Sequence, residues 1–190
     1  TLHAGQSRDH EALLRTKQAD IVITSDPLYD MDGLERRPIL TESFLLVLPQ
    51  DYDGPAGSLA ALLEHLPLVR FAGTTSVGRR IEQHLRRLKL DAPQIIQADR
   101  SSMVTACVAR GMGFTVLTPS LLIDGLVERM PLAIRPVPGP GFTRSITLLA
   151  REGELGEMPA QIADQAQTVL RSQIALHMGD AGEAALTFED

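Results

Sequence analysis

The chain has 190 residues, of which 44% are hydrophobic and 22% are charged, and its formal net charge is −6. This length suits one or two compact domains, and the composition argues against both a disordered chain and a membrane protein. An acidic chain lacks the basic face that displaces counterions from phosphate, so these totals exclude electrostatic nucleic-acid binding by the chain as it stands.

Targeting and redox signals are sparse. No apolar run approaches the roughly 18 residues that a spanning helix needs, and residues 1–20 carry no basic-then-apolar signal. The single cysteine, Cys107, excludes an internal disulfide, and its place on an apolar helix stripe favours a packing role. We therefore expect a cytoplasmic protein with no membrane partner, and we expect the chain to begin in the middle of a domain.

The first part of the chain predicts a helix and two strands. A helix begins within residues 6–9, and the β-branched run 21–24 predicts a buried, parallel strand. Aspartates, a glycine and a proline make 28–41 a predicted loop, after which 44–48 returns to the sheet. The turn-rich window 49–57 predicts a crossover into a second lobe.

Helices and strands then alternate. Ser58 is a predicted cap of a short helix, 66–71 is a predicted strand, and 72–78 is a predicted loop rich in hydroxyls. A helix over 79–90 and a strand over 94–98 follow. Basic residues of that helix form either a solvated face, which we favour, or a basic patch; they are Arg79, Arg80, Arg86, Arg87 and Lys89.

The most informative stretch begins at Ser101. Ser101 and Ser102 are predicted N-caps of a helix that runs to residue 110 and ends at Gly111. Gly113 then turns the chain sharply into a strand over 114–117. The N-terminus of such a helix lies at the edge of the sheet where α/β proteins bind ligands.

The last third predicts the return to the first lobe. A short helix over 121–126 precedes a second crossover over 131–144, which holds four prolines. Residues 145–150 predict a strand and 158–178 an amphipathic closing helix, whereas 179–190 predict a frayed tail.

Strands that alternate with helices predict an α/β fold with two lobes of mainly parallel, Rossmann-like sheet. The predicted division gives 1–52 to lobe I, 53–140 to lobe II and 141–178 to lobe I again, with 179–190 as a flexible tail. Two crossovers join the lobes in this prediction.

Four motifs in the same order resemble the effector-binding domain of LysR-type transcriptional regulators. They are DIVI at 20–23, FLLVLP at 44–49, VARGMGFTVLTP at 108–119 and LLAR at 148–151. The resemblance covers nearly the whole chain. It implies a type 2 periplasmic-binding-protein-like fold, a small-molecule effector in an interlobe cleft, a homodimer or tetramer, and DNA contact only through an N-terminal helix-turn-helix that this chain lacks, together with the first strand and helix of lobe I.

The resemblance places effector contacts on four polar loops. Their residues are Gln6, Ser7, Thr24, Ser25, Gly73, Thr74, Thr75, Ser76, Asp99, Arg100, Ser101 and Ser102. Free N–H groups and hydroxyls at helix N-termini suit an anion such as a carboxylate. The alternative is that these residues only cap helices, and Asp99 would repel an anion unless Arg100 compensates it.

Enzyme readings find little support. The five histidines lie far apart without metal-ligand spacing, and no nucleophile elbow or phosphate loop occurs. Asp30, Asp32 and Gly33 lack the remaining ligands of a calcium loop. We therefore expect no catalysis, no metal and no cofactor. The leading hypothesis is effector sensing in a LysR-type regulator, and the alternative is a transport-type solute-binding protein of the same two-lobe plan.

Overall fold

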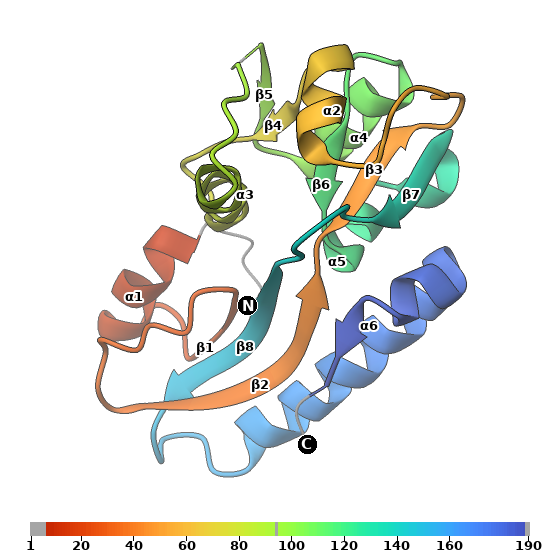
Figure 1. The fold of residues 1–190 in the computed structure, drawn as a ribbon. Helices are drawn as coiled ribbons and strands as arrows, with labels where there is room; N and C mark the ends of the chain where they lie inside the picture. Colours follow the sequence, from red (N-terminus) through yellow and green to blue (C-terminus); the bar gives the residue numbers. More distant parts are fainter. Residues whose placement is uncertain (1–6, 94, 189–190) are drawn as a thin grey trace. The chain divides into compact units, whose positions relative to one another are not determined.

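The computed structural model describes residues 7–93 and 95–188, which group into two compact units (Figure 1). The first unit comprises the chain up to Glu42, Arg144–Arg171 and the chain from Thr187. The second comprises Ser43–Thr143 and Ser172–Leu186. The predicted helix start at residues 6–9 lies partly outside the described residues.

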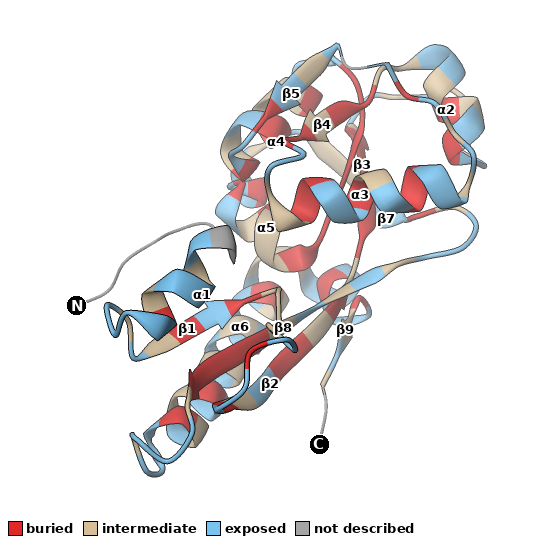
Figure 2. Ribbon diagram, turned by 90° about the vertical axis from the view of Figure 1, so that its left-hand side faces the viewer, coloured by how far each residue is buried: buried red, intermediate tan, exposed pale blue. Residues whose placement is uncertain are grey.

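The first unit is built on a four-stranded sheet in the order β1-β8-β2-β9. Its elements are α1 (Ser7–Arg15), β1 (Ile21–Thr24), β2 (Leu34–Ser43), β8 (Thr143–Arg151), the first part of α6 (Met158–Glu183) and β9 (Leu186–Thr187). Side chains of α1, β1, β2, β8 and the loop before β2 pack together in its core, which contains Leu14, Val22, Met31, Leu34 and Leu149. Figure 2 colours the buried residues of these elements red.

Two predictions about this unit were wrong. Strand β1 is antiparallel to β8, with Ile21 opposite Ala150, because β-branched residues indicate a strand but not its direction. Ile23 is 46% exposed, so only one face of β1 is buried. The predicted loop over 28–41 contains most of β2, and Pro38 is tolerated there because two-residue β9 leaves much of that side of β2 as a sheet edge.

Arg151 ties α1 to the sheet of the first unit. Its guanidinium donates to the carbonyl oxygens of Leu14 (3.2 Å) and Ala19 (2.8 Å) behind α1, and to Asp20 (2.6 Å) and Glu154 (2.6 Å). The bonds to both carboxylates raise the pKa of Arg151 further above its ordinary value. Arg151 therefore stays protonated, and its guanidinium satisfies the carbonyl oxygen at the C-terminal end of α1.

The second unit holds two small sheets. Its elements are β3 (Leu45–Pro49), α2 (Leu59–His65), β4 (Val69–Phe71), α3 (Ser76–Arg87), β5 (Ile96–Ala98), α4 (Ser101–Ala109), β6 (Thr115–Leu117), α5 (Pro119–Asp124), the 3₁₀ turn η1 (Val127–Arg129) and β7 (Leu132–Pro136). As predicted, Ser58 caps α2, accepting from the Ala61 N–H at 3.1 Å. The apolar sides of these elements form one continuous core.

The expectation of mainly parallel sheet was wrong in this unit as well. Strand β3 lies between β6 and β7 and is antiparallel to both, whereas β4 and β5 form the parallel pair. The second predicted crossover, 131–144, contains β7, because prolines at both ends of a short run leave its interior free to pair with β3. The fold is thus α/β with mixed sheets.

The chain passes from one unit to the other at residues that differ from the predicted lobe boundaries. The first crossing falls between Glu42 and Ser43, ahead of the predicted boundary at 52, and the next falls between Thr143 and Arg144. The turn-rich window 49–57 connects β3 to α2 inside the second unit. Turn residues mark a reversal of the chain, and here that reversal is local.

The two crossing segments are fixed side by side in the second unit. Phe44 donates its N–H to the Phe142 carbonyl (3.0 Å), and their rings stack at 4.1 Å between centroids. Phe142 stacks in turn on His84 of α3 at 3.9 Å. Arg80 and Arg87 of α3 donate to the carbonyl oxygens of residues 143 (2.9 Å) and 141 (3.2 Å). Helix α3 therefore anchors both crossings.

An ion pair fixes the same two segments in the first unit. The Glu42 side chain is fully buried, and its Oε1 accepts from Nε and Nη2 of Arg144, each at 2.7 Å. The Arg144 side chain is only 12% exposed. A buried carboxylate without its cation is costly, so this pair fixes the register where β2 and β8 leave the unit.

The predicted tail is ordered in its described part. Helix α6 continues to Glu183, with a break at Gly179 (φ 56°, ψ −148°), and β9 follows. Gly182 lies close against Ile174 and Met178, which is why a segment of small residues packs here and does not fray. Ala185 is only 6% exposed.

The predicted glycine turn after α4 is confirmed. Gly111 has φ 74° and Gly113 has φ 153°. A Cβ on Gly113 would collide with the Pro67 carbonyl oxygen, the same oxygen that accepts from the Phe114 N–H (3.0 Å), whereas a Cβ on Gly111 would meet nothing within 4 Å. The two glycines are therefore required for different reasons.

We predict that Gly113→Ala lowers the free energy of unfolding by more than about 2 kcal/mol, because it adds a backbone collision to an unfavourable φ. Gly111→Ala is the matched control and should cost only about 1 kcal/mol, the strain of the left-handed conformation. Urea denaturation of both variants measures the difference, and equal losses would contradict the collision.

We also predict a pH dependence from His84, which is 4% exposed. Burial lowers its pKa, and the Arg87 guanidinium beside Nδ1 lowers it further. Below about pH 6.5 the unfolded chain therefore binds a proton more readily, so stability falls as the pH drops from there towards the lowered pKa. His84→Phe, which keeps an aromatic ring, should reduce the loss of unfolding free energy between pH 7 and 5, and an unchanged slope would contradict this account.

Candidate functional site

Two of the predicted effector loops lie next to each other in the second unit. Strands β4 and β5 are parallel with Phe71 opposite Ala98, and the Ala72 N–H donates to the Ala98 carbonyl at 2.8 Å. The turns that follow these strands therefore leave from the same edge. They lead directly into α3 and α4, so the pairing brings two helix N-termini together.

The N-terminus of α3 is closed by its own cap. The Thr75 hydroxyl accepts from the Gly78 N–H (3.0 Å) and donates to the Ala72 carbonyl (2.6 Å). The helix begins at Ser76, three residues earlier than predicted, because Gly78 packs directly on the backbone of residue 72 in a helical first turn. The capping alternative is thus the better description of Thr75.

Gly73 and Thr74 form the exposed part of this turn. A Cβ on Gly73 would meet nothing within 4 Å, so the space above the turn is open. The Thr74 carbonyl accepts from Arg79 at 2.9 Å. Ser76 is already inside the helix and has a partner of its own. Gly73 and Thr74 are therefore the members of this predicted set that present surface.

The N-terminus of α4 differs from that of α3. Its N-cap is Arg100, which makes no side-chain cap bond, so the prediction that Ser101 and Ser102 are the caps was wrong. The Arg100 carbonyl accepts from the N–H groups of residues 103 and 104, each at 3.1 Å. Ser101 is 1% exposed and Ser102 is half-buried in the first turn. An uncapped helix start carries partial positive charge.

Thr105 holds that helix start in position. Its buried hydroxyl lies within hydrogen-bond distance of the carbonyl oxygens of Ser101 (3.1 Å), Ser102 (3.2 Å) and Gly125 (2.7 Å). A Cβ on Gly125 would come within 2.6 Å of the Thr105 methyl group. The first turn of α4 is therefore locked against the end of α5. No sequence pattern indicates this role, because Thr105 occupies a position that the helix periodicity assigns to the core.

Charges at this start are exposed and unpaired. Asp99 and Arg100 are both exposed, and no ion pair between them or to another described residue is present. The compensation of Asp99 by Arg100 that the sequence suggested is therefore not made in this state. Both side chains remain available to a ligand.

In the first unit, the predicted residues Thr24 and Ser25 belong to a turn that is held by its own hydrogen bonds. Thr24 is 4% exposed, and its hydroxyl accepts from the Asp26 N–H (3.1 Å), while Asp26 accepts from the Leu28 N–H (3.2 Å). Ser25 has a partner. Ser7 begins α1, and Gln6 lies outside the described residues.

Arg36 organises the same turn, and sequence reasoning missed it. Its guanidinium donates to four carbonyl oxygens, those of Pro27 (2.8 Å), Leu28 (2.6 Å), Met31 (2.8 Å) and Leu34 (3.0 Å). An arginine that satisfies several carbonyls fixes an irregular loop. No sequence pattern marks such a residue.

His10 is a second residue that the sequence assigned only to surface or packing. Burial lowers its pKa, although Asp9 and Asp26 act in the opposite direction. Its Nδ1 is buried and has no hydrogen-bond partner among the residues that the structure describes. Through its interaction with the Asp26 carboxylate, His10 couples α1 to the turn at residue 26.

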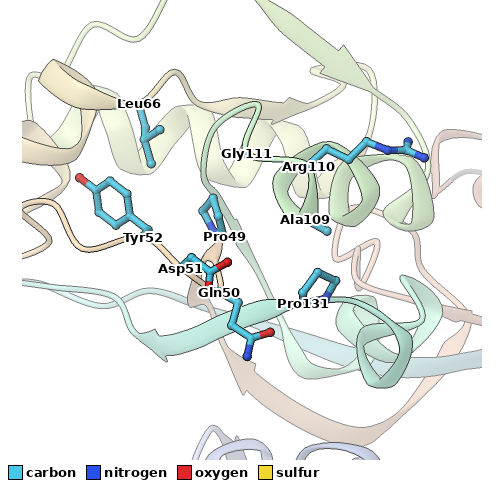
Figure 3. Close-up of a pocket in the computed structure, with 9 residues that line it drawn as sticks. All are labelled: Pro49, Gln50, Asp51, Tyr52, Leu66, Ala109, Arg110, Gly111 and Pro131. Carbon is cyan, nitrogen blue, oxygen red and sulfur yellow. The ribbon is translucent and has the colours of Figure 1, made fainter.

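One pocket of the second unit lies away from these loops, at the opposite end of α4. It has a volume of about 390 Å³, and none of the predicted effector residues lines it. Figure 3 shows Gln50, Asp51 and Pro131 around it, with the Arg110 guanidinium directed away from Asp51.

Metal and membrane sites were also sought in the described part of the chain. It contains no group of three or more histidine, cysteine, aspartate or glutamate side chains placed to hold a metal ion. None of its helices combines the length and apolarity needed to cross a bilayer.

A family model described as the LysR substrate binding domain matches residues 1–170. The chain belongs to the LysR substrate-binding domain family. This family comprises the effector-binding domains of LysR-type transcription regulators, and no curated protein sequence gives a significant match to this member.

Solved structures share the fold of this LysR domain. The OxyR C206 mutant of Corynebacterium glutamicum superposes with a TM-score of 0.75 at 24% identity, over 98% of this chain and 58% of that one. The regulatory domain of CcmR from Synechocystis PCC6803, in complex with 2-PG, gives 0.72 at 17% identity, over 90% and 83%. The effector-binding domain of QuiR in complex with shikimate gives 0.63 at 12% identity, over 90% and 77%. The LysR domain spans less than two thirds of the OxyR chain.

Different effects are predicted for the hydroxyls at the two helix starts. Thr75→Val should lower the free energy of unfolding by about 1 to 2 kcal/mol, because it removes a cap. Ser102→Ala should cost less than about 0.5 kcal/mol, because Ser102 caps nothing. Thermal denaturation of both variants tests this, and equal losses would mean that Ser102 is structural.

Proposed function

We propose that this LysR domain senses a small effector at the turns that follow β4 and β5. The observation that carries the proposal is the contrast between the two adjacent helix starts. Thr75 closes the N-terminus of α3, whereas no side chain caps the N-terminus of α4, where Ser102 is half-buried. An uncapped helix start of this kind binds an anionic group through its N–H groups and a nearby hydroxyl.

The chemistry favours a small carboxylate or phosphate-bearing acid. The Arg100 side chain is exposed and unpaired among the described residues, so it can add a charge-assisted bond. Gly73 leaves room for the body of the ligand on the neighbouring turn. The ligands named for CcmR and QuiR, 2-PG and shikimate, are consistent with this class.

The first-unit residues Gln6, Ser7, Thr24 and Ser25 remain proposed contacts from the family pattern. In that pattern both sets of loops face one effector in the interlobe cleft of a type 2 periplasmic-binding-protein-like fold. Binding would then shift the population between two arrangements of the regulator. Membership of the LysR family favours this mechanism over a transport-type solute-binding protein.

The wider setting is part of the same proposal. We infer that the chain acts in the cytoplasm, in a homodimer or tetramer whose DNA contacts come from an N-terminal helix-turn-helix, and that it catalyses no reaction. Each of these follows from the family, in which the sensor domain changes how paired DNA-binding domains meet the operator.

The test is a thermal-shift screen of small carboxylates and phosphorylated acids, followed by calorimetric titration of the best ligand. Ser102→Ala should weaken binding by about 2- to 15-fold, the loss of one hydroxyl contact, with little change in melting temperature. Gly73→Val should abolish binding, because the new side chain fills the space above the turn. The variant should fold normally, because a Cβ at this position meets no protein atom within 4 Å.

Gly57→Val is the matched control. Gly57 is also exposed, with nothing within 4 Å of a Cβ, but it precedes α2 and is not on either turn. The control should bind like the wild type. Full affinity in both Ser102→Ala and Gly73→Val would remove the effector from these turns.

A further inference from the structure

A second cavity of the second unit lies beside the crossing segments and away from the proposed effector turns. Its volume is about 290 Å³. Three stretches line it: residues 43–45 of the first crossing, residues between 134 and 141 around the end of β7, and alanines 181, 184 and 185 at the end of the chain. The matched family region ends at residue 170, so the alanine wall lies outside it.

One wall of this cavity is apolar and rigid. Phe44 is 2% exposed and its ring is backed by the stack with Phe142 and His84. Leu45, Ile134 and Val137 add aliphatic surface beside it. Phe44 is almost fully buried and therefore backs this wall, whereas the half-buried Ile134 and the exposed Pro136 present its accessible apolar surface. A preformed apolar surface lowers the entropic cost of binding.

The opposite wall is open because its side chains are small. Helix α6 breaks at Gly179, and the alanines that follow it leave space where larger side chains would fill the cavity. The Ser43 N–H donates to the Ala185 carbonyl at 2.8 Å, so this wall is fixed to the first crossing. The cavity is therefore formed by segments that are hydrogen-bonded to each other.

The lining carries a single charge. Arg135 is exposed on β7, opposite Leu46 of β3, and its guanidinium makes no hydrogen bond or ion pair with any described residue. Asp180 and Glu183 belong to the same terminal segment but do not line the cavity. A mostly apolar cavity with one free guanidinium at its rim matches a ligand with an apolar body and one carboxylate.

We propose that this cavity binds a small aromatic carboxylate, with its ring on the apolar lining formed by Ile134, Pro136 and Ala184 and its carboxylate on Arg135. The site is separate from the proposed effector turns and does not depend on that proposal. It lies on Ser43, the first residue of the second unit, and on Gly141, two residues before the second crossing. A ligand here would contact the segments next to two of the places where the chain passes between its units, at residues 42–43 and 143–144.

The experiment titrates the full chain with 2-naphthoate, whose fluorescence is measured directly because the chain contains no tryptophan. The uncharged 2-naphthamide is titrated in parallel. Arg135→Gln should weaken naphthoate binding about tenfold or more and leave naphthamide binding unchanged, because only the carboxylate uses the guanidinium. Gly141→Leu should weaken both, because it fills the cavity without backbone strain: its Cβ would meet nothing within 4 Å.

Two controls match these variants. Arg129→Gln removes an exposed arginine of η1, and Gly57→Leu adds a side chain at an equally open glycine, and both should bind naphthoate like the wild type. The proposal is overturned if the wild type shows no saturable binding up to about 1 mM, if Gly141→Leu binds normally, or if the controls lose as much affinity as the test variants. Ser102→Ala and Gly73→Val should retain naphthoate binding, which separates this result from the fate of the effector turns.

Discussion

The stack of Phe44, Phe142 and His84 is the contact on which the organisation of the second unit depends. The chain enters this unit at residue 43 and leaves it at residue 143, so the two ends of a hundred-residue excursion must be brought together. The stack and the bond from the Phe44 N–H to the Phe142 carbonyl close that loop. Closing a long loop costs conformational entropy, and the burial of aromatic rings where its two ends meet offsets this cost.

Helix α3 connects the stacked crossing segments to the proposed effector turns. Its last turns hold His84 and Arg87 against the crossings, and its first turn is capped by Thr75 beneath the exposed Gly73. A helix is a stiff connector over such a length. A ligand on the β4 turn therefore acts on one end of the same helix whose other end fixes the crossings. The α4 start, locked by Thr105, supplies the rigid partner surface.

Several elements could be predicted from the sequence because local chemistry determines them. Ser58 caps α2 as expected, and the two glycines after α4 adopt the positive φ angles that the turn requires. The adjacency of the loops after β4 and β5 also follows from a parallel pair. What local chemistry could not determine was strand direction: residues 21–24 read as a strand, but only the distant β8 decides that the pairing is antiparallel.

The site was predicted less completely than the fold, for a related reason. Ser101 and Ser102 have the chemistry of caps, yet the chain enters α4 one residue earlier, through Arg100. Arg36 and Arg151 fix irregular segments by donating to carbonyl oxygens, and such roles depend on where the backbone passes and not on neighbours in the sequence. Pro38 and Pro136 suggested loops, although both lie in strands.

The shortness of β4 and β5 has a consequence for how the domain responds to a ligand. Each has three residues, and together they carry both proposed turns. Short paired segments hold few backbone hydrogen bonds, so the turns that follow them open locally at less than the global unfolding free energy. Amide protons of the exposed residues 73, 74, 99 and 100 therefore exchange more readily with solvent than those of the buried Ala72 and Ala98. A ligand that bridges the two turns suppresses this opening, so part of its binding free energy is spent on ordering the edge that receives it.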